Sequence, residues 1–144
     1  MRINIKYHNR SYFNGLELKK INKGDWIDLY CAKTTRLIRG EYTLIPLGVS
    51  MELPKGYEAY VLPRSSTFKK YGILMANGMG IIDNSYCGDD DEWKFPALAV
   101  RDTIITRGER IAQFRIVKNQ PHIKFVSRET FGNINRGGFG TTGW

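Results

Sequence analysis

Apolar and polar residues alternate over short stretches of this chain, and this period of two constrains its fold more than any other feature. Ile3, Ile5 and Tyr7 are separated by polar residues, and the segment 57–61 repeats the pattern. Successive side chains of a strand point to opposite faces, so the alternation predicts half-buried strands. Further strands are expected in segments bounded by Gly, Pro, Asn and Asp, namely 26–32, 42–53, 94–100, 110–117 and 122–126.

Many short strands in one chain favour a sandwich, a barrel or a jelly roll. The 144 residues suffice for one domain. The sequence therefore predicts an all-β single domain over residues 1–131, a distorted jelly roll or β-barrel-like fold, followed by a flexible, glycine-rich arm over 132–144. One short helix is expected over Ser65–Tyr71, with Ser65 or Ser66 as its cap and Gly72 as its end.

The composition limits the partners of the protein. A formal net charge of +8 favours a polyanion, which is a nucleic acid, an anionic lipid surface or a small molecule with several phosphates. Cys31 and Cys87 lie far apart without a CxxC pattern or a neighbouring histidine, so neither a disulfide framework nor a zinc site is indicated. A reducing, cytoplasmic compartment fits. No apolar run approaches the length that spans a bilayer, so no membrane partner is expected.

Five short stretches carry unusual residue choices, and each is ambiguous alone. The stretch 63–66 can be a strand end with a capping pair, and the stretch 77–88 contains an Asp83–Asn84 pair that is typical of a surface turn. In chain order the stretches are 25–29, 63–66, 77–88, 110–114 and 135–143. Taken together, and over nearly the whole chain, they resemble the five motifs of the trimeric dUTPase family, in a bacterial or phage-like form.

The resemblance implies an enzyme of the dUTP diphosphatase type. Such an enzyme cleaves dUTP to dUMP and pyrophosphate by attack of water on the α-phosphorus, which keeps uracil out of DNA and supplies dUMP for dTTP synthesis. The resemblance also implies magnesium (Mg2+) as cofactor and a homotrimer as the working form. Phosphoryl transfer of this kind depends mainly on positioning and on charge neutralisation.

The resemblance assigns the catalytic roles residue by residue. Asp83 would bind the 3′-hydroxyl and orient the attacking water. Arg64 and Gln113 would lie at the α-phosphate, and Asp28 would hold the metal through water, as magnesium commonly keeps several waters.

The substrate-binding residues follow from the same motifs. Tyr86 would lie under the deoxyribose, where a ribose 2′-hydroxyl would clash, and the arm would close as a lid over a neighbouring subunit. In that lid Phe139 stacks on uracil and Arg136 reaches the γ-phosphate. The full set is Ser65 and Ser66 at the phosphates, Asn77, Gly80 and Ile82 near uracil, Tyr86 at the sugar, and Arg136, Phe139, Gly140, Thr141 and Thr142 in the arm.

The chain departs from the family pattern at two places. The acidic residues 89–92, followed by Trp93, interrupt the passage from the third motif into the next strand. Consecutive acids repel one another, so the favoured interpretation is an exposed turn, and the alternative is a contact with another subunit or with the lid through Trp93. The spacing between Arg136 and Phe139 is also short.

Three rival functions stay open at this stage. A dCTP deaminase would share the scaffold, but it needs a base, usually a glutamate, at the cytosine ring. The pairing of Asp83 with Tyr86, together with Phe139 in the tail, favours the pyrophosphatase. A regulatory, protein-binding role is a second alternative. A nucleic-acid-binding β domain is a third, which strongly salt-dependent oligonucleotide binding would support; we expect no nucleic-acid partner.

Overall fold

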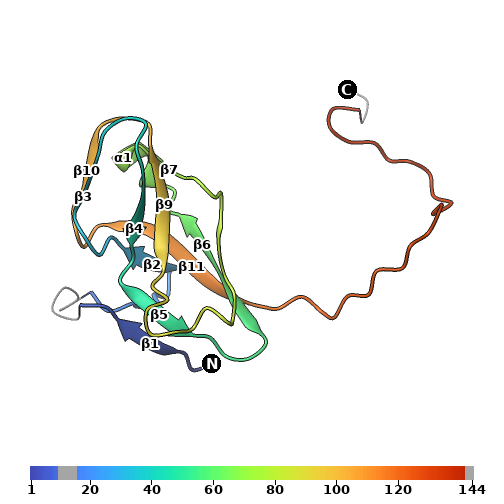
Figure 1. Ribbon diagram of the computed structural model, residues 1–144, viewed down its shortest axis with the longest axis horizontal. Helices are drawn as coiled ribbons and strands as arrows, with labels where there is room; N and C mark the ends of the chain where they lie inside the picture. Colours follow the sequence, from blue (N-terminus) through green and yellow to red (C-terminus); the bar gives the residue numbers. More distant parts are fainter. Residues whose placement is uncertain (10–15, 142–144) are drawn as a thin grey trace.

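The computed structural model describes residues 1–9 and 16–141, and these form an almost entirely β structure (Figure 1). The strands are β1 Asn4–Tyr7, β2 Ile27–Tyr30, β3 Thr35–Leu37, β4 Tyr42–Pro46, β5 Val49–Glu52, β6 Tyr57–Pro63, β7 Ile73–Met75, β8 Gly80–Ile82, β9 Lys94–Ala99, β10 Thr103–Ile105 and β11 Arg110–Lys118. One helix, α1 Thr67–Tyr71, lies between β6 and β7. The predicted all-β, jelly-roll-like class is confirmed.

Two antiparallel sheets form the body. The larger has the strand order β2-β11-β6-β8, and the second has the order β4-β9-β7. Two small pairs, β1 with β5 and β10 with β3, complete it. Neighbouring strands in each sheet are mostly distant in sequence, so long connections pass between the sheets, as in Greek-key and jelly-roll folds.

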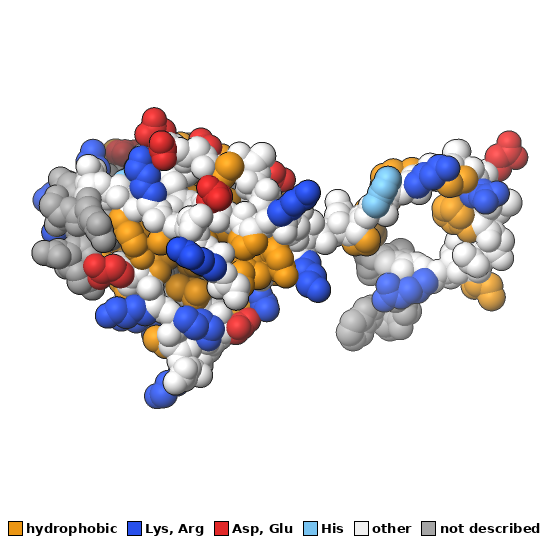
Figure 2. Space-filling model, turned by 90° about the horizontal axis from the view of Figure 1, so that it is seen from below, with side chains coloured by type: hydrophobic (Ala, Val, Ile, Leu, Met, Phe, Trp, Pro, Cys, Tyr) orange, Lys and Arg blue, Asp and Glu red, His pale blue; other side chains and the backbone are white. Residues whose placement is uncertain are grey.

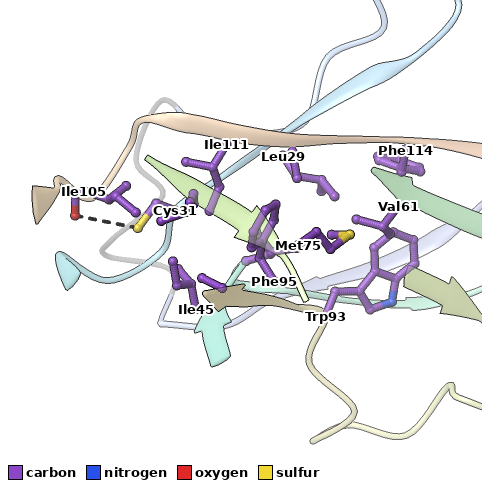
Figure 3. Close-up of a cluster of buried hydrophobic side chains, with 14 of the residues drawn as sticks. Leu29, Cys31, Ile45, Val61, Met75, Trp93, Phe95, Ile105, Ile111 and Phe114 are labelled. Atoms are coloured by element: carbon purple, nitrogen blue, oxygen red, sulfur yellow. Dashed lines mark hydrogen bonds between the residues drawn. The ribbon is translucent and has the colours of Figure 1, made fainter. Parts of the chain in front are cut away.

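The hydrophobic core lies between the two sheets (Figure 3). Leu29 of β2, Ile111 and Phe114 of β11 point toward Ile45 of β4 and Phe95 of β9, and all are almost completely buried. Strand β9 shows the predicted alternation directly: Phe95, Ala97 and Ala99 are buried while the residues between them are not. The period of two in the sequence therefore marks the inner face of the sandwich.

Trp93 corrects one expectation. It was grouped with an exposed acidic turn, but only 1% of its surface is exposed, and its ring meets Phe114 edge-on at 5.2 Å and 89°. The reason is the register of β9, because Trp93 stands two residues before Phe95 and continues its inward-facing row. The Trp93 side chain is therefore part of the core of this chain. Asp89 and Asp90 are exposed, as expected.

Two strand predictions need correction. The segment 42–53 is not one strand, because Gly48 with a φ of 75° turns the chain between β4 and β5. The segment 122–126 forms no strand and pairs with nothing in the described residues, and Phe125 is 92% exposed. Alternation alone does not make a strand where no neighbouring strand accepts its hydrogen bonds. The three-residue strands β3, β7 and β10 were not predicted.

The helix is shorter than predicted and is held differently. Gly72 ends it with a φ of 60°, as expected, but Ser66 at the N-cap position makes no side-chain capping hydrogen bond. The hydroxyl of buried Thr67 does the anchoring instead: it accepts a hydrogen bond from the Arg64 N–H at 3.0 Å and donates one to the Ile111 carbonyl at 2.8 Å. These two hydrogen bonds of the Thr67 hydroxyl connect the end of β6 to β11.

After β11 the chain leaves the body as an extended arm (Figure 1). The described residues 119–141 are exposed almost throughout and contain no strand. Apolar and basic side chains are scattered along this arm, seen to the right of the body in Figure 2. No helix within residues 1–9 and 16–141 is long and apolar enough to cross a membrane.

Candidate active site

A pocket lined by several basic side chains lies where β2, β11 and the end of β6 meet. Its lining includes Asp28, Arg64, Ser65, Arg110 and Gln113, which come from three of the five sequence motifs. Asp28 and Gln113 are directly paired in register across β2 and β11, so sheet hydrogen bonding alone places them side by side. We call this group the phosphate pocket, after the ligand that the resemblance of its motifs implies. Ser66, at the start of α1, is not among its lining residues.

Asp28 is the centre of this pocket. Its carboxylate pairs with the Arg64 Nε at 3.0 Å and with an Arg110 terminal nitrogen at 3.4 Å. Asp28 and Arg64 are each about one-quarter exposed, so the pairing serves to hold the guanidinium in place more than to stabilise the fold. Because Asp28 takes the Nε, the two terminal nitrogens of Arg64 stay available for an anion.

Gln113 is fixed by a single backbone contact. Its side-chain N–H2 donates to the Pro63 carbonyl at 3.1 Å, which leaves the amide oxygen and the second N–H unbound in the described structure. Gln113 therefore presents polar atoms to the same space as Arg64. The sequence could not distinguish Arg110 as a pocket residue from a sheet-edge charge, and the structure resolves it as a partner of Asp28.

A second pocket lies at the opposite edge of the same sheet, beside β8. Its lining includes Asn77, Gly80, Ile82, Asp83 and Tyr86, so the third motif is gathered in one place. A Cβ on Gly80 would lie 3.1 Å from the Val61 Cβ, and this close approach of β8 to β6 explains the glycine. We call this group the nucleoside pocket, again after the ligand that the resemblance implies. It shares no lining residue with the phosphate pocket.

Asp83 is preorganised as an anion. One carboxylate oxygen accepts hydrogen bonds from the Ser85 N–H at 2.8 Å and the Ser85 hydroxyl at 2.7 Å. These two donors lower the pKa of Asp83 below its ordinary value. The other carboxylate oxygen has no hydrogen bond in the described structure. Asn84, which donates to the Leu53 and Pro54 carbonyls at 2.9 and 3.0 Å, fixes the turn to the body.

Tyr86 lies three residues beyond Asp83, and its phenol is also fixed. The hydroxyl donates to the Glu92 carbonyl at 3.0 Å. Partial burial, followed by the nearby charges of Asp91 and Glu92, raises the pKa of Tyr86, so the phenol is neutral and acts as a donor.

The predicted lid residues lie outside both pockets. Arg136, Phe139 and Gly140 belong to the exposed arm, and the Phe139 side chain is fully exposed. The Thr141 hydroxyl turns back to bond the backbone of Gly138, accepting from its N–H at 2.8 Å. Thr142 lies outside the described residues.

The model of the dUTPase family matches residues 26–143, which include the nucleoside pocket, most of the phosphate pocket and nearly all of the arm. A relative from Bacillus subtilis (strain 168), the SPbeta prophage-derived deoxyuridine 5′-triphosphate nucleotidohydrolase YosS, is 50% identical over 143 residues and is covered to 99%, as is this chain. This chain belongs to the dUTPase family. The recognition made from the five motifs is thereby confirmed.

Solved structures support the dUTPase fold. A mutant of the Staphylococcus bacteriophage 80alpha dUTPase with dUpNHpp superposes with a TM-score of 0.76 at 20% identity, covering 99% of each chain. A mutant dUTPase from phage phi11 of S. aureus, whose structure concerns a structural Mg(II) ion, has a TM-score of 0.73 at 18% identity and covers 90% of this chain and 99% of its own. At these identities the likeness concerns the fold alone.

The structure adds residues to the phosphate pocket that the sequence did not single out as site residues. Lys19, Ile21 and Trp26 also line the phosphate pocket. The Trp26 ring lies 5.6 Å from the Arg115 guanidinium, which pairs with Asp25 at 2.9 Å. Asp25 and Trp26 belong to the first motif, so the motif itself was the available signal, whereas nothing near Lys19 marked it.

The Thr67 bridge gives a first prediction. In Thr67→Val a methyl group replaces the hydroxyl, which leaves the Arg64 N–H and the Ile111 carbonyl without this partner. We expect the free energy of unfolding to fall by about 1–3 kcal/mol, measured by urea denaturation. Thr43→Val in β4 is the matched control, because the Thr43 hydroxyl makes no hydrogen bond in the described structure, and it should stay within about 0.5 kcal/mol of the wild type. Equal effects would contradict an anchoring role for Thr67.

Proposed function

We propose that this protein hydrolyses dUTP to dUMP and pyrophosphate by attack of a water on the α-phosphorus. The observation that carries the proposal is the pair of pockets on one sheet, one lined by arginines and one containing Asp83 and Tyr86. The named activity of the curated relatives supports it. The family match favours this reaction over dCTP deamination. In the cell the reaction would keep uracil out of DNA and provide dUMP for dTTP synthesis.

The phosphate pocket supplies the electrostatic part of the mechanism. The terminal nitrogens of Arg64 face the space where a triphosphate would lie, and Gln113 and Ser65 offer neutral hydrogen bonds beside them. Cations fixed before the substrate arrives stabilise negative charge that develops on the phosphoryl oxygens without reorganising. Asp28 keeps the Arg64 side chain in this position.

In the nucleoside pocket Asp83 would receive the 3′-hydroxyl and orient the water. Its free carboxylate oxygen is the acceptor for these contacts, since Ser85 occupies the other. Tyr86 would pack under the sugar, and backbone groups near Asn77 and Ile82 would read the uracil edge. A rigid hairpin of this kind rejects substrates whose polar groups do not match.

Magnesium fits the phosphate pocket only as an ion shared with the substrate. Asp28 is the one carboxylate that lines the pocket, and no three His, Cys, Asp or Glu residues within 1–9 and 16–141 are grouped to hold a metal ion by themselves. Magnesium typically keeps several waters and is held by one or two carboxylates with substrate phosphates. We propose that Asp28 holds it through water. The bound ion would neutralise phosphate charge.

A homotrimer with shared sites accounts for the division of the pockets. β2 and β8 are the two edges of the four-stranded sheet, so the phosphate and nucleoside pockets lie apart on one chain. We propose that the phosphate pocket of one subunit completes the nucleoside pocket of another, and that the arm, with Arg136 and Phe139, closes over a neighbouring subunit's site. A cytoplasmic location and a regulatory protein partner stay predictions.

The reaction is tested by incubating the purified protein with magnesium and dUTP, dCTP, dTTP or UTP, and by measuring pyrophosphate and ammonia. We expect pyrophosphate from dUTP alone and its loss on chelation. Ammonia from dCTP would place the protein among the deaminases. Release of neither product from any of the four nucleotides would leave a binding role.

Asp83→Asn tests the water-orienting role. The substitution removes the charge but keeps the shape, so kcat should fall by about 100- to 10,000-fold while KM changes little. Because the pKa of Asp83 is lowered, the carboxylate stays ionised until the pH falls through that lowered value, and the acid limb of the wild-type kcat profile should lie below the ordinary pKa of an aspartate. Near-normal turnover of the variant would refute the role.

Mixing two inactive variants tests the shared site. Arg64→Ala damages the phosphate pocket and Asp83→Asn the nucleoside pocket. When the two proteins are unfolded together and refolded as mixed trimers, some sites combine two intact halves, and activity should return. Each variant refolded alone is the control. Activity that stays absent in verified mixed trimers would show that both halves come from one chain.

A further inference from the structure

The acidic segment between the third motif and β9 is held far more firmly than an exposed turn. The Asp91 carboxylate accepts the Gly88 N–H at 2.8 Å, and the Asp91 N–H donates to the Gly88 carbonyl at 3.1 Å. A Cβ on Gly88 would lie 2.8 Å from that carboxylate, so the Asp91 side chain closes directly over Gly88. The segment 88–93 is therefore a closed turn, which we call the brace.

The brace is attached to β5 and its flank by partly buried hydrogen bonds. The Ser50 hydroxyl, 4% exposed, donates to the Asp91 carbonyl at 2.8 Å. Its oxygen also lies 2.7 Å from the His8 Nε2, and because the hydroxyl proton is already committed, His8 is the donor in that contact. The Glu92 carboxylate accepts the Gly48 N–H at 3.1 Å. The contacts of Ser50 with Asp91 and of Glu92 with Gly48 therefore hold the brace beside β5, and His8 supports the first of them through Ser50.

The far end of the brace is fixed by the core. Backbone bonds join the Trp93 N–H to the Val49 carbonyl and the Leu47 N–H to the Trp93 carbonyl, at 2.8 and 2.9 Å. The Trp93 ring is buried against Phe114. Glu92 lies between these anchors, and its carbonyl is the acceptor for the Tyr86 hydroxyl. The position of this carbonyl is thus set by both ends of the brace.

We propose that the brace positions the Tyr86 ring and so sets how strongly the enzyme rejects ribonucleotides, with Ser50 and Asp91 as positioning residues. The inference rests on the proposed function, in which Tyr86 packs under the deoxyribose. Exclusion of a single 2′-hydroxyl needs a ring that does not yield, because a displacement of about 1 Å would make room for the extra oxygen. Ser50 and Asp91 do not line the nucleoside pocket themselves, whereas Glu92 and Trp93 of the brace line it beside Tyr86. Ser50 and Asp91 therefore act on the pocket through the brace, by way of the Glu92 carbonyl that accepts the Tyr86 hydroxyl.

Two neighbouring acids provide a matched test. Asp91→Ala removes the carboxylate that accepts the Gly88 N–H and so loosens the turn. Asp90→Ala removes the same charge from an exposed side chain that makes no contact in the brace. The measured quantity is kcat/KM for dUTP divided by kcat/KM for UTP. We expect Asp91→Ala to lower this ratio by about tenfold, chiefly through faster use of UTP, and Asp90→Ala to leave it unchanged. Equal ratios for the two variants would overturn the proposal.

The route through Tyr86 is tested by a double-mutant cycle. Tyr86→Phe removes the hydroxyl that meets the Glu92 carbonyl. If the brace acts through that hydroxyl, adding Asp91→Ala or Ser50→Ala to Tyr86→Phe should change the ratio no further. Effects that multiply independently would show that the segment acts by another route and would refute the proposal.

The outcome is separable from that of the proposed function. Wild-type protein that releases no pyrophosphate from dUTP would remove the proposed function itself. If the wild type is active on dUTP and Asp91→Ala leaves the dUTP-to-UTP ratio of kcat/KM unchanged, only the proposed role of the brace is refuted. Thermal unfolding of every variant identifies global destabilisation, and Ser50→Ala removes a different contact of the brace, the bond to the Asp91 carbonyl, if Asp91→Ala does not fold.

Discussion

The pairing of β11 with two strands at once is the interaction on which the rest of the structure depends. β11 hydrogen-bonds β6 from Ala112 to Lys118 and β2 on its other edge. This double pairing puts Gln113 beside Asp28 and brings the end of β6, with Arg64, into the same corner. The inner side chains of β11 also form one wall of the core, so the packing that stabilises the fold and the geometry that builds the phosphate pocket have the same origin.

The local arrangement of charges at the two pockets matters more than the net charge of the chain. The excess of +8 attracts a triphosphate, but a site made only of cations would also hold arginines apart by repulsion. Asp28 solves this locally, because one carboxylate orients two guanidiniums. At the other pocket Asp83 is kept ionised by two donors from Ser85, and Tyr86 is kept neutral by burial near acids. Asp83 and Tyr86 are thus each held in the protonation state that their proposed roles require.

The acidic segment shows how an interruption of a family pattern can become part of the framework. Its charges suggested a solvated turn, yet its backbone is fixed by Ser50, Glu92 and Trp93. Asp89 and Asp90 stay exposed to water, which solvates their charges, while Asp91 and Glu92 make the hydrogen bonds that hold the turn. A polar segment can be rigid when its hydrogen bonds are made to buried partners, since such bonds do not exchange with solvent.

The sequence by itself determined the all-β class, the principal strands, the family and the grouping of the third motif, because these depend on local alternation and on residues close in the chain. Only the tertiary structure decided that Arg110 pairs with Asp28 from 82 residues away, that Lys19 joins the phosphate pocket, and that Trp93 enters the core. It also decided that residues 122–126 form no strand within this chain. The physical reason is that alternation states which residues share a face, whereas the choice of neighbouring strand, and with it every contact across the sheet, is made by long-range hydrogen bonding and core packing.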